Sequence, residues 1–110
     1  MTEISFYLDE KEEYFGFEAK GHAGFKRSGK DIVCAGISAL TITFINSIDE
    51  LLKKEIVVET DEKTGYMLVK VPEYSTPEVQ LLFSVLHLGL KEIEKEYTRY
   101  LKLTNRRCKP

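Results

Sequence analysis

The sequence predicts an α+β fold in which two β-hairpins and two long helices follow one another in the order ββαββα. Runs with a two-residue period alternate along the chain with runs whose apolar residues recur every three or four positions. Two strand pairs can form a four-stranded, mainly antiparallel sheet, which the two helices can cover. A chain of 110 residues suffices for one hydrophobic core, so we expect a single domain over residues 1–110.

The first hairpin is predicted over residues 3–21. Ile4–Leu8 and Tyr14–Gly21 have strand-like patterns, and the charged segment Asp9–Glu13 between them is typical of a turn. A glycine-rich loop from His22 to Lys30 follows, and loops of this composition are commonly mobile.

The first helix is expected from about Ile32 to Lys53, because apolar residues recur there at helical spacing and Asp31 can cap its start. The residues that share this spacing are Ile37, Leu40, Phe44, Ile48 and Leu51. The second hairpin is predicted next, with strands at Ile56–Thr60 and Tyr66–Val71.

The second helix is predicted to begin at Thr76 and Pro77, which are typical of a helix cap and a first helical turn. Its apolar spacing continues to Tyr100, so we expect the helix to end near Leu103. A helix of that length would measure about 40 Å, more than a small domain spans, which suggests that part of it packs against a second subunit. Residues 104–110 are expected to form a flexible tail.

Composition and charge indicate a globular protein. Apolar residues make up 43% of the chain and charged residues 31%, and the formal net charge is -2, so bulk charge gives no reason to expect nucleic acid as a partner. No apolar run approaches about 20 residues, so we expect neither a membrane span nor a signal peptide. Two widely spaced cysteines favour free thiols and a reducing, cytoplasmic location.

Residues 21–35 contain the side chains that are best suited to catalysis. Cys34 lies in the first turn of the expected helix, where the positive end of the helix favours a thiolate. His22 lies at the far end of the glycine-rich loop, which is long enough to bring the imidazole to Cys34 as a general base. Ser38 lies one turn beyond Cys34 on the same face and could donate a hydrogen bond.

Other interpretations of these residues stay open. A cysteine in a helix is often a small buried apolar residue. Asp31 is most simply a helix cap, although it could also orient His22 as the third member of a triad. The backbone N–H groups of Cys34 and its neighbours in the first turn could stabilise an oxyanion.

Two alternative kinds of site overlap the same loop. Residues 24–30 match the GxxxxGK pattern of a phosphate-binding loop, but Asp31 follows where that pattern needs Ser or Thr, which argues against nucleotide binding. A basic cluster of Lys26, Arg27 and Lys30 leaves open a non-enzymatic module that binds the ribosome or rRNA. The histidines and cysteines lack the spacing of metal ligands, so we expect neither a metal nor another cofactor.

The motifs GHAG at residues 21–24 and GKDIVCAGISAL at residues 29–40 resemble the bacterial ribosomal-processing cysteine protease family, Prp. The resemblance implies that the protein is a cysteine endopeptidase and that His22 and Cys34 are its catalytic pair. Two further family positions, which support this pair, match Asp31 and Ser38.

The resemblance also implies a substrate and an assembly state. The family substrate is the N-terminal extension of a large-subunit ribosomal protein, which is cut after aromatic residues. The resemblance also implies that the protein is a homodimer. A glycine loop is taken to order over the bound peptide, and its glycines match Gly21, Gly24 and Gly29.

Overall fold

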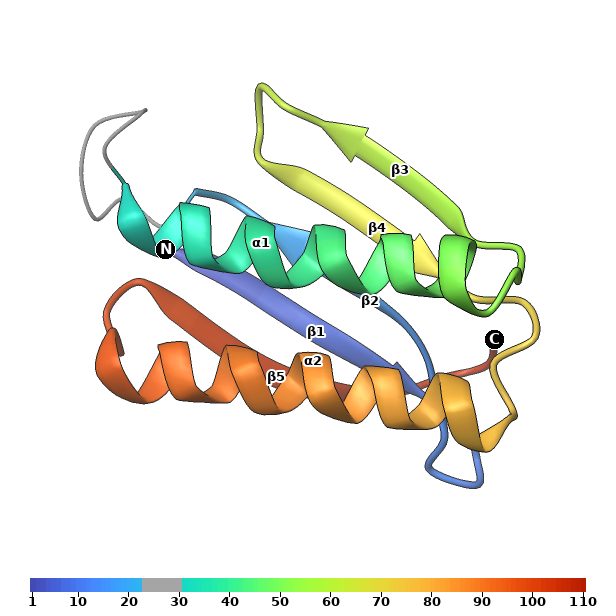
Figure 1. Ribbon diagram of the computed structural model, residues 1–110. Helices are drawn as coiled ribbons and strands as arrows, with labels where there is room; N and C mark the ends of the chain where they lie inside the picture. Colours follow the sequence, from blue (N-terminus) through green and yellow to red (C-terminus); the bar gives the residue numbers. More distant parts are fainter. Residues whose placement is uncertain (23–30) are drawn as a thin grey trace.

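The computed structural model describes residues 1–22 and 31–110, and within these ranges it confirms the predicted α+β class (Figure 1). Both predicted hairpins and both predicted helices are present in the predicted order. A short π-helical segment follows the first helix, and a further strand follows the second. In chain order the elements are β1 (Thr2–Leu8), β2 (Tyr14–Lys20), α1 (Ile32–Asn46), η1 (Ser47–Leu51), β3 (Val57–Asp61), β4 (Tyr66–Lys70), α2 (Pro77–Glu96) and β5 (Leu101–Arg107).

The described residues form a five-stranded sheet with the strand order β3-β4-β2-β1-β5. Neighbouring strands are antiparallel, except that β1 and β5 run parallel. Helices α1 and α2 lie side by side on the same face of this sheet (Figure 1). The expected four-stranded, mainly antiparallel sheet is therefore corrected to a mixed sheet with one more strand in the described part of the chain.

The strand that the sequence analysis missed is β5, at the end of the chain. Helical spacing predicted that the second helix ends near Leu103, but α2 ends at Glu96, and Tyr97 already has φ -127° and ψ 57°. The strand then runs beside the whole length of β1. Residues 104–110 were expected to form a flexible tail, and this is wrong for residues 104–107, because the strand continues to Arg107.

The turn between α2 and β5 explains why the helical spacing was misleading. Tyr97 and Tyr100 continue the apolar spacing of the helix, but their rings pack against the core from this turn, in which the N–H of Tyr100 donates to the carbonyl oxygen of Tyr97. Helix α2 has 20 residues, which corresponds to about 30 Å. The longest dimension of the described structure is 38 Å, so the excess helix length that suggested a second subunit does not exist.

The first helical region begins at the predicted residue and ends slightly before Lys53. Ile32 is the first residue of α1, and the side chain of Asp31 caps it. The last helical residues, Ser47–Leu51, have the wider hydrogen-bonding pattern of a π-helix.

The expectation that no segment is apolar enough to span a membrane is wrong for this same helical region. Ile32–Leu51 has 20 residues and a mean hydropathy of 1.6, which makes it long and apolar enough by length and composition. A core helix of a globular protein passes the same test, and this one packs Val33, Ile37 and Phe44 into the core. Packing against the sheet and α2 explains the apolar character of this buried face, while Ile32, Ile42 and Leu51 of the same segment are exposed.

The core lies between the helices and the covered face of the sheet. Phe44 of α1 and Phe83 of α2 are in contact, with ring centroids 4.6 Å apart, and Phe44 also contacts Phe17 of β2. Other side chains that are fully or almost fully buried here are Ile4, Phe6, Val33, Ile48, Val69, Val79, Leu90 and Leu101. Burial of this apolar surface favours folding and holds the start of α1 against the sheet, close to the end of β2.

Candidate active site

A cavity of about 390 Å³ lies between the first turns of α1, the end of β2 and the turn that joins β3 to β4. Cys34 and Ser38 line it from α1, while Gly21 and His22 line it from the segment that follows β2. The fold therefore brings both residues of the predicted catalytic pair, and the predicted supporting serine, to one cavity.

The position of Cys34 is set by the cap of α1. One oxygen of the Asp31 carboxylate, Oδ1, accepts hydrogen bonds from the N–H groups of Val33 and Cys34, both at 2.9 Å. Asp31 is thus the N-cap that the sequence predicted. Cys34 is half-buried in the first turn, where the aligned peptide dipoles of the helix favour a negative charge on the sulfur.

The same cap limits what the backbone of this turn can do. The N–H groups of Val33 and Cys34 donate to the Asp31 side chain, and the N–H of Ala35 donates to the Asp31 carbonyl oxygen at 3.1 Å. These groups already have acceptors in the described structure. These three N–H groups are therefore not free to stabilise an oxyanion in the described structure, contrary to what the sequence suggested for them.

His22 is exposed, and its position is set by the tight turn at the end of β2. Gly21 has a φ of +83°, a left-handed conformation that glycine adopts without a steric penalty. The hydroxyl of Thr2 donates to the carbonyl oxygen of Gly21 at 3.3 Å. A side chain at residue 21 would meet the carbonyl oxygen of Met1 at 2.7 Å, so the backbone before His22 lies tightly against the start of the chain.

Ser38 and Thr41 form the polar part of the α1 face that lines the cavity. The hydroxyl of Thr41 is buried and donates to the carbonyl oxygen of Ile37 at 3.0 Å, so the structure gives it a structural role. Ser38 is exposed one turn after Cys34 and faces the same cavity. Ser38 is therefore the exposed hydroxyl that α1 presents to this cavity.

The second hairpin contributes a wall of the cavity that the sequence analysis did not foresee. Thr60, Asp61 and Met67 belong to its strands and line the cavity opposite α1. Met67 reaches this place because β4 pairs with β2 and sets it opposite Ala19. This pairing joins segments that are far apart in the chain, so no local sequence pattern could have indicated it.

Several sequence-based predictions fall outside the described residues. The substrate-loop positions Gly24 and Gly29 belong to residues 23–30, as do the basic residues on which the RNA-binding alternative depends, Lys26, Arg27 and Lys30. Among the residues that the structure describes, no three His, Cys, Asp or Glu side chains are placed to hold a metal ion together.

Comparison with known proteins connects this cavity to a protein family. The family model described as Cysteine protease Prp matches residues 1–102. Ribosomal processing cysteine protease Prp of Bacillus subtilis (strain 168) is 35% identical over 92 residues, which cover 80% of this chain and 82% of the relative. The protein of the same name from Staphylococcus aureus (strain Mu50) is 31% identical over 83 residues, covering 76% and 78% of the two chains.

A solved structure agrees with the sequence comparison. The crystal structure of an essential ribosomal processing protease Prp from S. aureus, in complex with a covalently linked product peptide, superimposes with a TM-score of 0.91 at 25% identity, covering 96% of this chain and all of the other. The fold, the sequence and a cavity lined by a cysteine in the first turn of a helix all agree. This chain therefore belongs to the Cysteine protease Prp family and is a cysteine protease.

Proposed function

We propose that this enzyme removes the N-terminal extension of a large-subunit ribosomal protein precursor, with Cys34 as the nucleophile and His22 as the general base. The observation that carries the assignment of residues is that both side chains line one cavity. The substrate class is supported by the names of the similar proteins from B. subtilis and S. aureus, which are ribosomal processing proteases.

The proposed reaction proceeds through an acyl-enzyme. His22 takes the proton of the Cys34 thiol, and the thiolate attacks the carbonyl carbon of the scissile peptide bond. The protonated imidazole then gives its proton to the leaving amine as the carbon–nitrogen bond breaks, which leaves a thioester on Cys34. His22 next removes a proton from water, which hydrolyses the thioester and regenerates the thiol.

Asp31 and Ser38 have supporting roles in this proposal. Asp31 holds the first turn of α1, so that the thiolate forms at the positive end of the helix. Its own negative charge opposes the thiolate, and its two hydrogen bonds from backbone N–H groups partly balance that charge. Ser38 lines the same cavity, which supports a role in which its hydroxyl donates a hydrogen bond to the thiolate or to the carbonyl oxygen of the substrate.

The walls of the cavity suit an extended peptide with an aromatic residue at the cleavage site. Ala19, Ile37 and Met67 contribute apolar surface next to Cys34. Burying an aromatic side chain against such surface contributes about 1.5–3 kcal/mol to binding. This agrees with the cleavage after aromatic residues that the sequence resemblance implies.

The test is incubation of the purified enzyme with the extended ribosomal protein of the same organism, followed by mass measurement. We expect the wild-type enzyme to shorten the precursor at one site, Cys34→Ala to leave it intact and His22→Ala to lose most of the rate. Cys108→Ala is the matched control, because this cysteine is exposed at the other end of the sheet, and it should cleave normally. Comparable trimming by Cys34→Ala would contradict the proposal, and salt-dependent RNA binding by an inactive protein would favour the alternative module.

We further propose that the enzyme acts in the cytoplasm as a homodimer. A cytoplasmic location follows from a ribosomal substrate and from the free thiols of both cysteines. The dimer is supported by a stripe of exposed apolar residues along α2, defined by Leu81, Val85 and Leu88, whose exposed fractions are 63%, 54% and 65%. A second copy that packs on this stripe would remove the apolar surface from water.

A further inference from the structure

We infer that Gly65, in the turn between β3 and β4, is a positioning residue for the imidazole of His22. This inference rests on the proposed role of His22 as the general base. Gly65 lines the same cavity as His22 and Cys34, although it is far from both in the sequence.

The geometry around Gly65 leaves no room for a side chain. A Cβ atom at this position would lie 2.8 Å from the carbonyl oxygen of Gly21 and 3.0 Å from Cε1 of the His22 ring. Real Cβ atoms essentially never come closer than 3.0 Å to such atoms. The backbone of Gly65 is therefore in direct contact with both the peptide that precedes His22 and the imidazole itself.

The opposite side of the same peptide is also fixed. The hydroxyl of Thr2 donates to the carbonyl oxygen of Gly21, and Met1 lies against the α-carbon of Gly21. The segment before His22 is thus held between the start of β1 and the turn from β3 to β4. His22 itself is exposed, so these backbone contacts are what orient its ring in this inference.

The turn that contains Gly65 is itself held by local hydrogen bonds. The N–H of Lys63 donates to Oδ1 of Asp61 at 3.0 Å, and the hydroxyl of Thr64 donates to the carbonyl oxygen of Asp61 at 3.4 Å. Gly65 follows with a φ of +69°, which favours glycine and tolerates asparagine. A fixed turn of this kind can hold the imidazole in one position, and small displacements of a catalytic group are costly to the rate.

The variants Gly65→Ala and Gly65→Asn test the inference in the precursor-cleavage assay. Both place a Cβ atom against His22, and asparagine tolerates the left-handed backbone, so it keeps the turn folded if alanine does not. We expect kcat to fall about tenfold or more with little change in KM. Lys63→Ala is the matched control in the same turn, because this exposed residue takes part in the turn only through its backbone N–H, and it should keep kcat within about twofold of the wild type.

Two further measurements separate positioning from a general loss of structure. The chain has two histidines, so NMR can follow the Cε1–H signal of each, and Gly65→Asn should move the His22 signal while the His87 signal stays in place. The rate at which iodoacetamide alkylates Cys34 should fall in Gly65→Asn, but adding Gly65→Asn to His22→Ala should cause no further fall. A structural effect would instead lower the rate in both backgrounds.

The outcomes distinguish this inference from the proposed function on which it rests. If His22→Ala is inactive while both Gly65 variants keep the wild-type kcat, Gly65 does not position His22 and the inference is wrong. The inference is also wrong if Gly65→Asn slows alkylation equally with and without His22. If His22→Ala cleaves the precursor at the wild-type rate, His22 is not the general base, and both its proposed role and this inference are wrong.

Discussion

Among single residues, Asp31 links the start of α1 to the chemistry of Cys34. Its carboxylate oxygen accepts two backbone N–H groups, and one of them belongs to Cys34 itself. An aspartate in this place contributes a cap and also brings a negative charge close to the nucleophile. The two effects can be separated, because asparagine retains the acceptor oxygen and removes the charge.

Replacing Asp31 by alanine should therefore lower the free energy of unfolding by about 1 kcal/mol, whereas Asp31→Asn should stay within about 0.5 kcal/mol of the wild type. Urea denaturation followed by circular dichroism measures both values. If Asp31 also orients His22, Asp31→Asn will in addition lower kcat while keeping this stability. Equal stability of Asp31→Ala and the wild type would contradict the cap.

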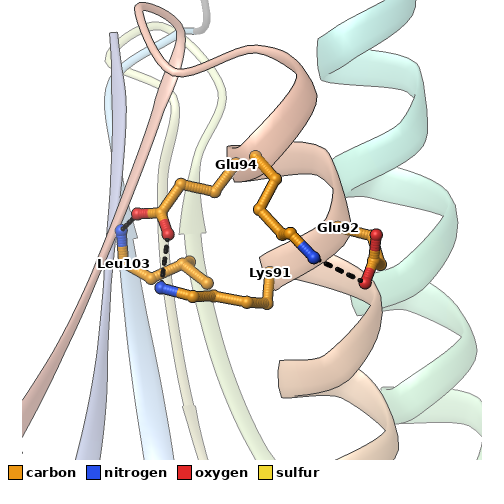
Figure 2. A network of polar contacts seen from close by, with 5 residues as sticks. Lys91, Glu92, Glu94 and Leu103 are labelled. Atoms are coloured by element: carbon orange, nitrogen blue, oxygen red, sulfur yellow. Dashed lines mark hydrogen bonds and ion pairs between the residues drawn. The ribbon is translucent and has the colours of Figure 1, made fainter.

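At the level of elements, a single carboxylate joins α2 to β5. Glu94 accepts a hydrogen bond from Nζ of Lys91 at 2.8 Å and another from the backbone N–H of Leu103 at 2.7 Å (Figure 2). Partial burial raises the pKa of the Glu94 carboxyl group, but these two hydrogen bonds together with the positive charges of Lys91 and His87 outweigh it, so the pKa is lowered. Glu94 thereby links α2 to β5, whose first residues were predicted from the sequence to continue the helix.

We expect Glu94→Gln to lower the free energy of unfolding by about 1–2 kcal/mol at pH 7, because the ionised acceptor of two hydrogen bonds is lost. A carboxyl group whose pKa is lowered by folding stabilises the protein above its unfolded pKa, near 4.5, and this contribution is lost as the pH falls through the folded pKa. The difference between variant and wild type should therefore shrink in urea titrations as the pH falls below about 4.5.

The control for this measurement is Glu92→Gln on the same helix. Glu92 pairs with Lys95 at 3.5 Å, but both side chains are 66% exposed, so its loss should change the stability little (Figure 2). An equal loss of stability in both variants, or a difference for Glu94→Gln that does not change with pH, would show that Glu94 does not join the two elements in this way.

At the scale of the whole molecule, the parallel pairing of β1 with β5 sets the first and last strands of the chain side by side, with the two termini at opposite ends of the pair (Figure 1). Tyr97 and Tyr100 pack against the core at the end of α2 and are half-buried, so they offer little of their apolar surface to an interface. An apolar surface on α2 that is exposed to a second subunit is the stripe of Leu81, Val85 and Leu88, on the side of the helix that faces away from the core.

If this stripe forms the proposed dimer, Val85→Lys should convert it to a 12.7 kDa monomer at micromolar concentration, with little loss of subunit folding. Sedimentation analysis measures the mass, and Thr98→Glu, an exposed change near the end of α2, is the control that should stay dimeric. A wild-type protein that sediments as a monomer would contradict the proposed dimer. A Val85→Lys variant that dimerises normally would show that the dimer does not form through this stripe.

The sequence by itself determined the features that depend on neighbouring residues. Asp31 and Thr76 were identified as helix caps because a cap interacts with N–H groups within three residues of itself. The hairpins were predicted from their alternating strands and intervening turns. Cys34 and His22 were selected by their local motifs, and the fold places both beside one cavity.

Only the tertiary structure decided the features that depend on distant pairing. Strand β5 was missed because Tyr97 and Tyr100 continue the helical spacing of α2, while the partner of Leu101 is Thr2, at the opposite end of the chain. The contact of Gly65 with His22 likewise exists because β2 and β4 pair. Helical periods and caps act within a few residues, whereas the stability of a strand comes from the partner beside it, which local periodicity does not encode.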